Sequence, residues 1–308
     1  MTATPPSTKP PSGSLASRVI VAMAVISVFA TLAWADATHL GNAAPVVWLL
    51  PIVLIVAAGG GIEVVRMAAA RSLPLDPAVV AGGAAAIAAA PALAPWIAGC
   101  GPFAAPGLAA VAAVAVLIVA FAIAVAGYDP DRRPLVRVTG SVAAAIWIGL
   151  PLAFMVALRL HGHALPDRAL GGLLPILSLI AVVKGSDTAA YAIGSMVGTH
   201  RMAPRLSPGK TWEGAAGGIV GAMATAWLVI DVLGKGSPVT PLGGWPLFGL
   251  CVGCAGILGD LAESLVKREL DAKDSGRSLF GMGGFLDLID SLLLAAPVAW
   301  ALWVAGPP

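Results

Sequence analysis

Long apolar runs recur along almost the whole of this 308-residue chain, and they constrain its fold more than any other feature. Hydrophobic residues make up 58% of the sequence. Charged residues make up only 11%, against roughly 25% in an ordinary soluble domain. Because an apolar run of about 20 residues crosses a bilayer as a helix, the sequence predicts an all-α, polytopic integral membrane protein. The same composition excludes a water-soluble enzyme.

We predict about nine transmembrane helices. They cover residues 19–34, 45–62, 78–99, 106–127, 138–159, 170–196, 213–233, 245–262 and 285–305. A cleaved signal peptide is the alternative for the first run, but we expect an uncleaved span because the rest of the chain is itself polytopic. The predicted organisation is a disordered N-terminal tail at 1–17, N-terminal transmembrane helices at 18–160 and a C-terminal region at 170–305 that carries the candidate catalytic residues.

The distribution of positive charge predicts the orientation in the membrane, since Lys and Arg in short loops favour the cytoplasmic side. If the N-terminus is cytoplasmic, 14 of the 18 Lys and Arg residues fall on inside segments, 3 fall outside and Lys184 lies within a span. The net charge of +2 is too small to indicate a nucleic-acid partner. Cys251 and Cys254 are interpreted as apolar helix residues, with a zinc or redox site as the alternative.

Polar residues that hydrocarbon should exclude gather after residue 180. Lys184 and Asp187 lie in an otherwise apolar span, where each charge costs roughly 2.5 to 3.5 kcal/mol unless it is paired or wet. They are expected to line a polar cavity, or to form a structural pair at i, i+3 spacing. Tyr191 and Gly194 share the face of Asp187 and suit a ligand or a close helix neighbour.

The segment at 197–212 is expected to be a compact, basic loop between two spans. Its end, Ser207-Pro208-Gly209-Lys210-Thr211, leads directly into a helix whose N-terminal amides point back at the loop. A lysine and hydroxyl groups at a helix N-terminus form a place to hold phosphate. An ordinary positive cytoplasmic loop is the alternative.

A second polar group follows in the eighth span. Asp260, Glu263, Ser264 and Lys267 are spaced 0, 3, 4 and 7, so they share one face if the helix continues through them.

Asp287 and Asp290 open the last span, again on one face. The helix dipole explains Asp287 but fits Asp290 poorly, because the apolar span has begun by then. The predicted topology brings all these segments to the cytoplasmic side. Carboxylates close together suggest a divalent ion such as Mg²⁺, and the Lys and Arg residues around them suggest a polyphosphate.

At these residues the chain resembles the phosphatidate cytidylyltransferase (CDP-diacylglycerol synthase) family. The family signature, Ser-x-x-Lys-Arg, Lys-Asp, a Gly-Gly turn and Asp-x-x-Asp, is matched by Ser264, Lys267, Arg268, Lys273, Asp274, Gly283, Gly284, Asp287 and Asp290. The upstream pattern, Asp-x-x-Ala-Tyr and then Ser-Pro-x-Lys-Thr-x-Glu-Gly, is matched by Asp187, Ala190, Tyr191, Ser207, Pro208, Lys210, Thr211, Glu213 and Gly214.

The chain departs from the signature at three positions. Phe280, Met282 and Leu288 replace the usual Pro or Gly, His and Arg, so no role of that His or Arg is carried over. We expect a divergent active member, with an inactive relative as the alternative.

The resemblance implies an enzyme that joins CTP to phosphatidate and releases CDP-diacylglycerol and pyrophosphate. It implies Mg²⁺ on Asp260 and Asp287, with room for a second cation, and catalytic roles for Lys267 and Asp290. The substrate-binding residues that it implies are Asp187, Tyr191, Ser207, Lys210, Thr211, Glu213, Ser264, Arg268, Lys273 and Asp274. It further implies a bacterial-type inner membrane, an active site facing the cytoplasm and a homodimer.

Two other functions remain open at this stage. A transporter or proton-coupled carrier would use the buried charges of Lys184, Asp187 and Asp290. The charged residues of the second half lie toward one side of the predicted membrane instead of its midplane, which argues against a transporter. The other is a different CTP-dependent lipid phosphotransferase.

Overall fold

The computed structural model describes residues 15–38, 44–97, 101–165, 169–234, 239–272, 275–276 and 283–307. In these ranges nearly all of the chain is helical. The elements are α1 (Leu15–Ala37), α2 (Leu50–Ala70), η2 (Ala78–Gly82), α3 (Gly83–Ala89), η3 (Ala90–Trp96), α4 (Ala104–Ala126), η4 (Pro130–Arg132), α5 (Pro134–Ala164), η5 (Ala169–Gly172), α6 (Leu174–Val197), β1 (Arg201–Ala203), β2 (Ser207–Thr211), α7 (Trp212–Ala226), η6 (Trp227–Leu233), α8 (Gly244–Glu269) and α9 (Phe285–Val304).

Eight helical stretches of the described chain are long and apolar enough to cross a membrane. They correspond to the second through ninth predicted spans, and α1 corresponds to the first, although only Ile26–Ala37 of α1 counts as a shorter apolar helix. The chain is therefore a polytopic, all-α integral membrane protein, as predicted. Most of the predicted tail, residues 1–14, lies outside the described residues.

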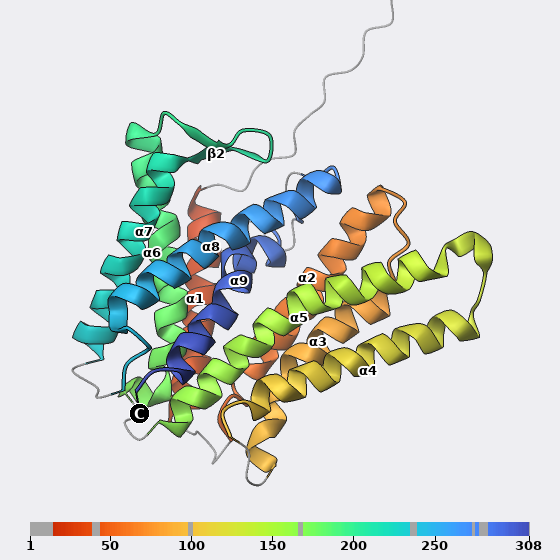
Figure 1. The fold of residues 1–308 in the computed structure, drawn as a ribbon, viewed down its shortest axis with the longest axis horizontal. Coiled ribbons are helices and arrows are strands. Elements are labelled where there is room, and N and C mark those ends of the chain that lie inside the picture. The colour runs from red at the N-terminus through yellow and green to blue at the C-terminus, as the bar shows by residue number, and fades with distance from the viewer. Residues whose placement is uncertain are drawn as a thin grey trace, which may run out of the picture.

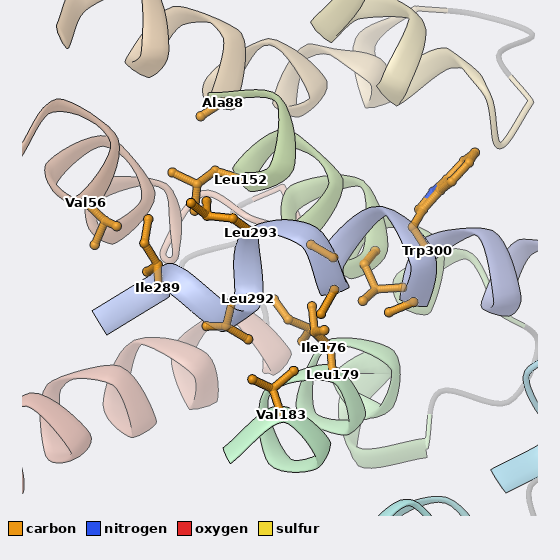
Figure 2. Packing of buried hydrophobic residues seen from close by; sticks show 14 of the residues in the cluster. Val56, Ala88, Leu152, Ile176, Leu179, Val183, Ile289, Leu292, Leu293 and Trp300 are labelled. Atoms are coloured by element: carbon orange, nitrogen blue, oxygen red, sulfur yellow. The ribbon is translucent and has the colours of Figure 1, made fainter. Parts of the chain in front are cut away.

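Helix α9 is the centre of the hydrophobic core. In Figure 1 it lies between the group formed by α6, α7 and α8 and the group formed by α2 to α5. Figure 2 shows side chains of α9 directed to both groups: Leu293 lies near Leu152 of α5, and Leu292 lies near Val183 of α6. Because α9 begins at Phe285, this packing fixes the two acidic residues of its first turns relative to both halves of the chain.

The second span is longer than predicted. The sequence suggested an end at 62, after Gly59-Gly60-Gly61, but α2 continues to Ala70. These glycines serve packing: a Cβ on Gly61 would lie 2.8 Å from Cα of Ala81, on the neighbouring helix η2. Close helix approach in lipid favours such small residues, so the glycines do not end the helix.

The structure adds detail to two further predictions. The predicted compact loop at 197–212 contains a small antiparallel hairpin, in which β1 pairs with β2. The third span is not one regular α-helix but the succession of η2, α3 and η3, with Pro95 inside its last part. In Figure 1 the hairpin lies at one end of α6 and α7, and the C-terminus lies at the opposite end of the molecule.

A buried ion pair joins α1 to α5 at that opposite end. The Nε atom of Arg159 donates to Oδ2 of Asp36 at 2.7 Å, and both side chains are almost fully buried. The predicted span ended at residue 159, but α5 continues past Arg159 to Ala164.

Candidate active site

Three helices bring five acidic side chains together. We call them the acidic cluster: Asp187 of α6, Asp260 and Glu263 of α8, and Asp287 and Asp290 of α9. Asp187 lies within electrostatic reach of Asp260 and Asp290. Glu263 has Asp287 and Asp290 as neighbours. The prediction that α8 continues through Asp260 to Lys267, and that these distant segments meet at one end of the bundle, is confirmed.

Two lysines pair with the cluster on the side of α6 and the hairpin. Lys210 of β2 places its Nζ atom 2.8 Å from Oδ2 of Asp260. Lys184 lies 3.5 Å from Oδ2 of Asp187 and donates to the carbonyl oxygen of Leu288 at 3.4 Å. The predicted i, i+3 pair of Lys184 and Asp187 is therefore present, but it also forms part of the cluster.

Lys267 pairs with the residues of the acidic cluster that lie on α8 and α9. Its Nζ atom lies 3.0 Å from Oδ1 of Asp287 and 3.3 Å from Oε1 of Glu263, whose side chain is fully buried. The other oxygen of Asp287 accepts the backbone N–H of Gly284 at 2.8 Å, which caps α9. Asp287 thus combines the helix-dipole role predicted for it with a direct contact to a lysine.

Ser291 joins two members of the cluster, and sequence reasoning missed it. Its buried hydroxyl lies 3.0 Å from an oxygen of Asp290 and 3.4 Å from an oxygen of Asp187. Since a single serine in an apolar helix is common, only its position one residue after Asp290 could have signalled this role.

A cavity of about 560 Å³ opens beside the acidic cluster. Its volume lies within the range of about 300 to 1,000 Å³ that is typical of small-molecule sites. The predicted site residues among its lining are Asp187, Tyr191, Ser207, Lys210, Thr211 and Asp260. Arg201 also lines it, so the cavity has acidic residues on its helical side and basic residues on its hairpin side.

Thr211 and Glu213 also make contacts within the protein at the start of α7. Thr211 lines the cavity, but its hydroxyl also caps α7 by accepting the N–H of Gly214 at 3.1 Å. Glu213 is not among the lining residues; its carboxylate accepts from the hydroxyl of Thr199 at 2.8 Å and contacts the ring of His200.

Ser264 and Arg268 lie on α8 beyond the lining of the cavity. Ser264 is half-buried, and Arg268 donates to the carbonyl oxygen of Leu206 at 3.2 Å, which ties α8 to the hairpin. Lys273 and Asp274 lie outside the described residues.

The charges of the cluster fit a divalent cation. Lys184, Lys210 and Lys267 pair with four of the five carboxyl groups, and Asp290 contacts Ser291, so acidic groups outnumber lysines among the described residues of the cluster. No group of three or more His, Cys, Asp or Glu residues in the described ranges is arranged as a metal site. Mg²⁺ usually takes only one or two protein carboxylates together with substrate phosphates, so a site here would need the phosphates of a bound nucleotide.

Comparisons with known proteins confirm the resemblance drawn from the motifs. A phosphatidate cytidylyltransferase of Brucella suis biovar 1 (strain 1330) is 46% identical over 131 residues, which cover 42% of this chain and 46% of the relative. A phosphatidate cytidylyltransferase of Mycobacterium leprae (strain TN) is 38% identical over 180 residues, or 58% of this chain and 53% of the relative. The uncharacterized protein YnbB of Escherichia coli (strain K12) is 37% identical over 159 residues, or 51% of this chain and 52% of the relative.

The chain spans about half the length of the curated relatives it matches. The family match is more extensive, because the model of the cytidylyltransferase family covers residues 16–305. These residues include all of α1 except Leu15, every element from α2 to α9 and the whole acidic cluster. The chain belongs to the cytidylyltransferase family.

Proposed function

We propose that this protein is a phosphatidate cytidylyltransferase, which transfers CMP from CTP to phosphatidate and releases pyrophosphate. The observation that carries the proposal is the acidic cluster with its three lysines beside a cavity at one end of an apolar bundle. A nucleotide triphosphate reaches this end from water, and a lipid headgroup reaches it from the bilayer. The named relatives and the family match support the same reaction.

The proposed metal ligands are Asp260 and Asp287. Asp187 lies within electrostatic reach of Asp260, and Glu263 is a neighbour of Asp287. Bound Mg²⁺ would supply charge neutralisation at the phosphates of CTP. A second cation would also be bound by carboxylate oxygens of the acidic cluster.

The residues of the chain would act mainly by positioning and by charge. The phosphate of phosphatidate is already an anion, so its oxygen attacks the α-phosphorus of CTP without a strong general base. The bond between the α-phosphorus and the bridging oxygen breaks, and pyrophosphate leaves. We assign Lys210 and Lys267 to the phosphates, because their Nζ atoms already face carboxylates of the cluster.

The lipid would approach along α6 and the start of α7. Tyr191 lines the cavity and is 80% exposed on the surface of the bundle, and Met196 and Trp212 beside the same end are also largely exposed. Exposed aromatic side chains at the end of a membrane helix are typical of the membrane–water interface. The charge distribution of the sequence supports placing this end at the cytoplasmic face of a bacterial inner membrane.

The position of the label in CTP tests the reaction type. Purified protein in mixed micelles with phosphatidate and Mg²⁺ receives CTP labelled at the α- or at the γ-phosphate. We expect the α-label in the lipid and the γ-label in free pyrophosphate. A γ-label in the lipid would indicate a CTP-dependent lipid kinase, and no labelled lipid from either substrate would overturn the proposal.

A homodimer belongs to the same proposal and rests on the family resemblance alone. Light scattering of the protein in detergent tests it, with a mass of two chains as the expected result. The alternative of a transporter is not favoured by the family match.

A further inference from the structure

A buried acidic residue in the N-terminal half contacts the start of α9. Glu63 lies in α2, and its side chain is among the largest that are fully buried. Its two carboxylate oxygens accept the backbone N–H groups of Phe285 and Leu286, each at 3.0 Å. The hydroxyl of Ser275 donates to the same carboxylate at 3.2 Å. One carboxylate thus receives three donors from residues more than 200 positions away in the sequence.

The backbone around this carboxylate is packed so closely that only glycine fits. A Cβ atom on Gly276 would lie 2.8 Å from Oε1 of Glu63, and one on Gly284 would contact both Glu63 and the hydroxyl of Ser275. Since real Cβ atoms do not approach so closely, these two glycines allow the chain to surround Glu63. The contact therefore lies at the point where α9 begins.

The same turn of backbone carries a residue of the acidic cluster. Gly284, which packs against Glu63, donates its N–H to Oδ2 of Asp287 at 2.8 Å. Oδ1 of Asp287 in turn accepts from Lys267 at 3.0 Å. Two carboxylates thus accept backbone N–H groups at the first turn of α9, Glu63 from α2 and Asp287 from within α9.

We propose that Glu63 is a positioning residue that fixes Asp287 and Asp290 for metal and nucleotide by holding the first turn of α9. This rests on the function proposed above. A carboxylate suits the role because both of its oxygens accept hydrogen bonds, whereas an amide presents an NH₂ group to one of the donors. Outer partners that orient metal ligands typically change metal affinity or activity by about 10- to 100-fold when mutated.

The test compares three variants of the full-length protein. Glu63→Gln removes one acceptor, and Glu63→Asp keeps the charge on a shorter side chain. Asp76→Asn is the control, because Asp76 also accepts two backbone N–H groups at a helix start, from Ala78 at 3.0 Å and Val79 at 3.3 Å, and its ion-pair partner is Arg137, which is not part of the acidic cluster. For each variant we would measure the Mg²⁺ concentration that gives half-maximal CMP transfer, and hydrogen exchange of the amides at 285–290.

We expect Glu63→Gln to raise the half-saturating Mg²⁺ concentration by about 10- to 100-fold and to accelerate exchange at 285–290. Glu63→Asp should give an intermediate shift, and Asp76→Asn should leave both quantities at the wild-type value. If Glu63→Gln does not fold, the shift in Glu63→Asp decides. Wild-type Mg²⁺ dependence in the Glu63 variants, or an equal shift in Asp76→Asn, would overturn the proposal.

The two proposals fail in different ways. If the wild-type protein transfers no CMP, the proposed function fails, while hydrogen exchange and Mn²⁺ binding followed by electron paramagnetic resonance still test Glu63. Unchanged exchange at 285–290 together with unchanged Mn²⁺ affinity in Glu63→Gln would then overturn the positioning role on its own.

Discussion

Asp287 is the residue at which three features of the site meet: a helix cap, a lysine contact and a neighbouring carboxyl group. Asp287→Asn keeps the size of the side chain and removes its charge. We expect CMP transfer to fall by about 100-fold, because an ion ligand and the partner of Lys267 are lost together. Initial rates measured against Mg²⁺ concentration check this.

The matched control for that variant is Asp271→Asn. Asp271 is 72% exposed and pairs with Arg71 at 2.6 Å, outside the cavity lining. It should retain wild-type turnover. Equal rates in Asp287→Asn and Asp271→Asn would contradict the metal assignment.

Lys210 is the residue of the hairpin that we assign to the phosphates of CTP. Lys210→Gln should raise the KM for CTP by about 10- to 100-fold, since a hydrogen bond to a charged group contributes about 1.5 to 3 kcal/mol. Arg205→Gln changes a charge on the same hairpin, but Arg205 is exposed and does not line the cavity. A KM that rises equally in both variants would point to a general attraction of CTP to positive charge.

At this scale the sequence predicted which residue types gather, and it predicted local pairs. The i, i+3 pair of Lys184 and Asp187 follows from helix geometry alone. The contact of Lys210 with Asp260 joins residues 50 positions apart, so it depends on how the hairpin lies over α8. The role of Glu63 was missed, although a single acidic residue in an apolar span is itself a signal of function.

Helices α6 and α7 pack through small residues, and both contribute to the lining of the cavity together with the hairpin and α8. A Cβ atom on Gly221 would press on Ala189, and one on Gly218 would lie 3.0 Å from Cβ of Ala190. We therefore expect Gly221→Val to separate the helices, to lower stability by about 1 to 3 kcal/mol and to reduce CMP transfer. Thermal unfolding in detergent and initial rates measure both effects.

The control is Gly107→Val on α4. Gly107 is also a helix residue, and apart from its own neighbouring helix backbone no described atom lies within 4 Å of the position that its Cβ would take. Its substitution should leave unfolding temperature and transfer close to wild type. If Gly221→Val behaves in the same way, α6 and α7 do not depend on close packing.

The presence of each membrane helix could be predicted from the sequence, but the helix lengths were predicted less accurately. Apolar runs locate the spans, but α2 continues through three glycines because they pack against Ala81 and the ring of Phe285. The hairpin of β1 and β2 was missed, since strands of three and five residues give too short a pattern to recognise. The ends of these helices and strands therefore depend on tertiary contacts more than on the local conformational preference of the sequence.

The whole molecule is also held at the end opposite the acidic cluster, by the buried pair of Arg159 and Asp36. Arg159→Leu leaves Asp36 buried without its partner, so we expect the free energy of unfolding to fall by about 3 to 5 kcal/mol. The KM for CTP of the folded enzyme should not change. A double variant, Asp36→Leu with Arg159→Leu, should regain stability, and a single variant as stable as the double would contradict this role.

At the scale of the molecule, the topology was the most predictable feature, because nine apolar runs place the polar segments on one side. The acidic cluster follows from that alternation. The central position of α9, with α6 on one side and α5 on the other, could not be predicted, because every apolar face in lipid is equally free to meet any other.

Metal binding at the acidic cluster in the presence of CTP tests the account most directly. Electron paramagnetic resonance of Mn²⁺ with the purified protein and CTP measures it without relying on turnover. We expect the wild-type protein and Asp271→Asn to bind Mn²⁺ with the same affinity, and Asp260→Asn and Asp287→Asn to bind it at least about 10-fold more weakly. Wild-type affinity in both of the last two variants would contradict the assignment of this cluster as the metal and nucleotide site.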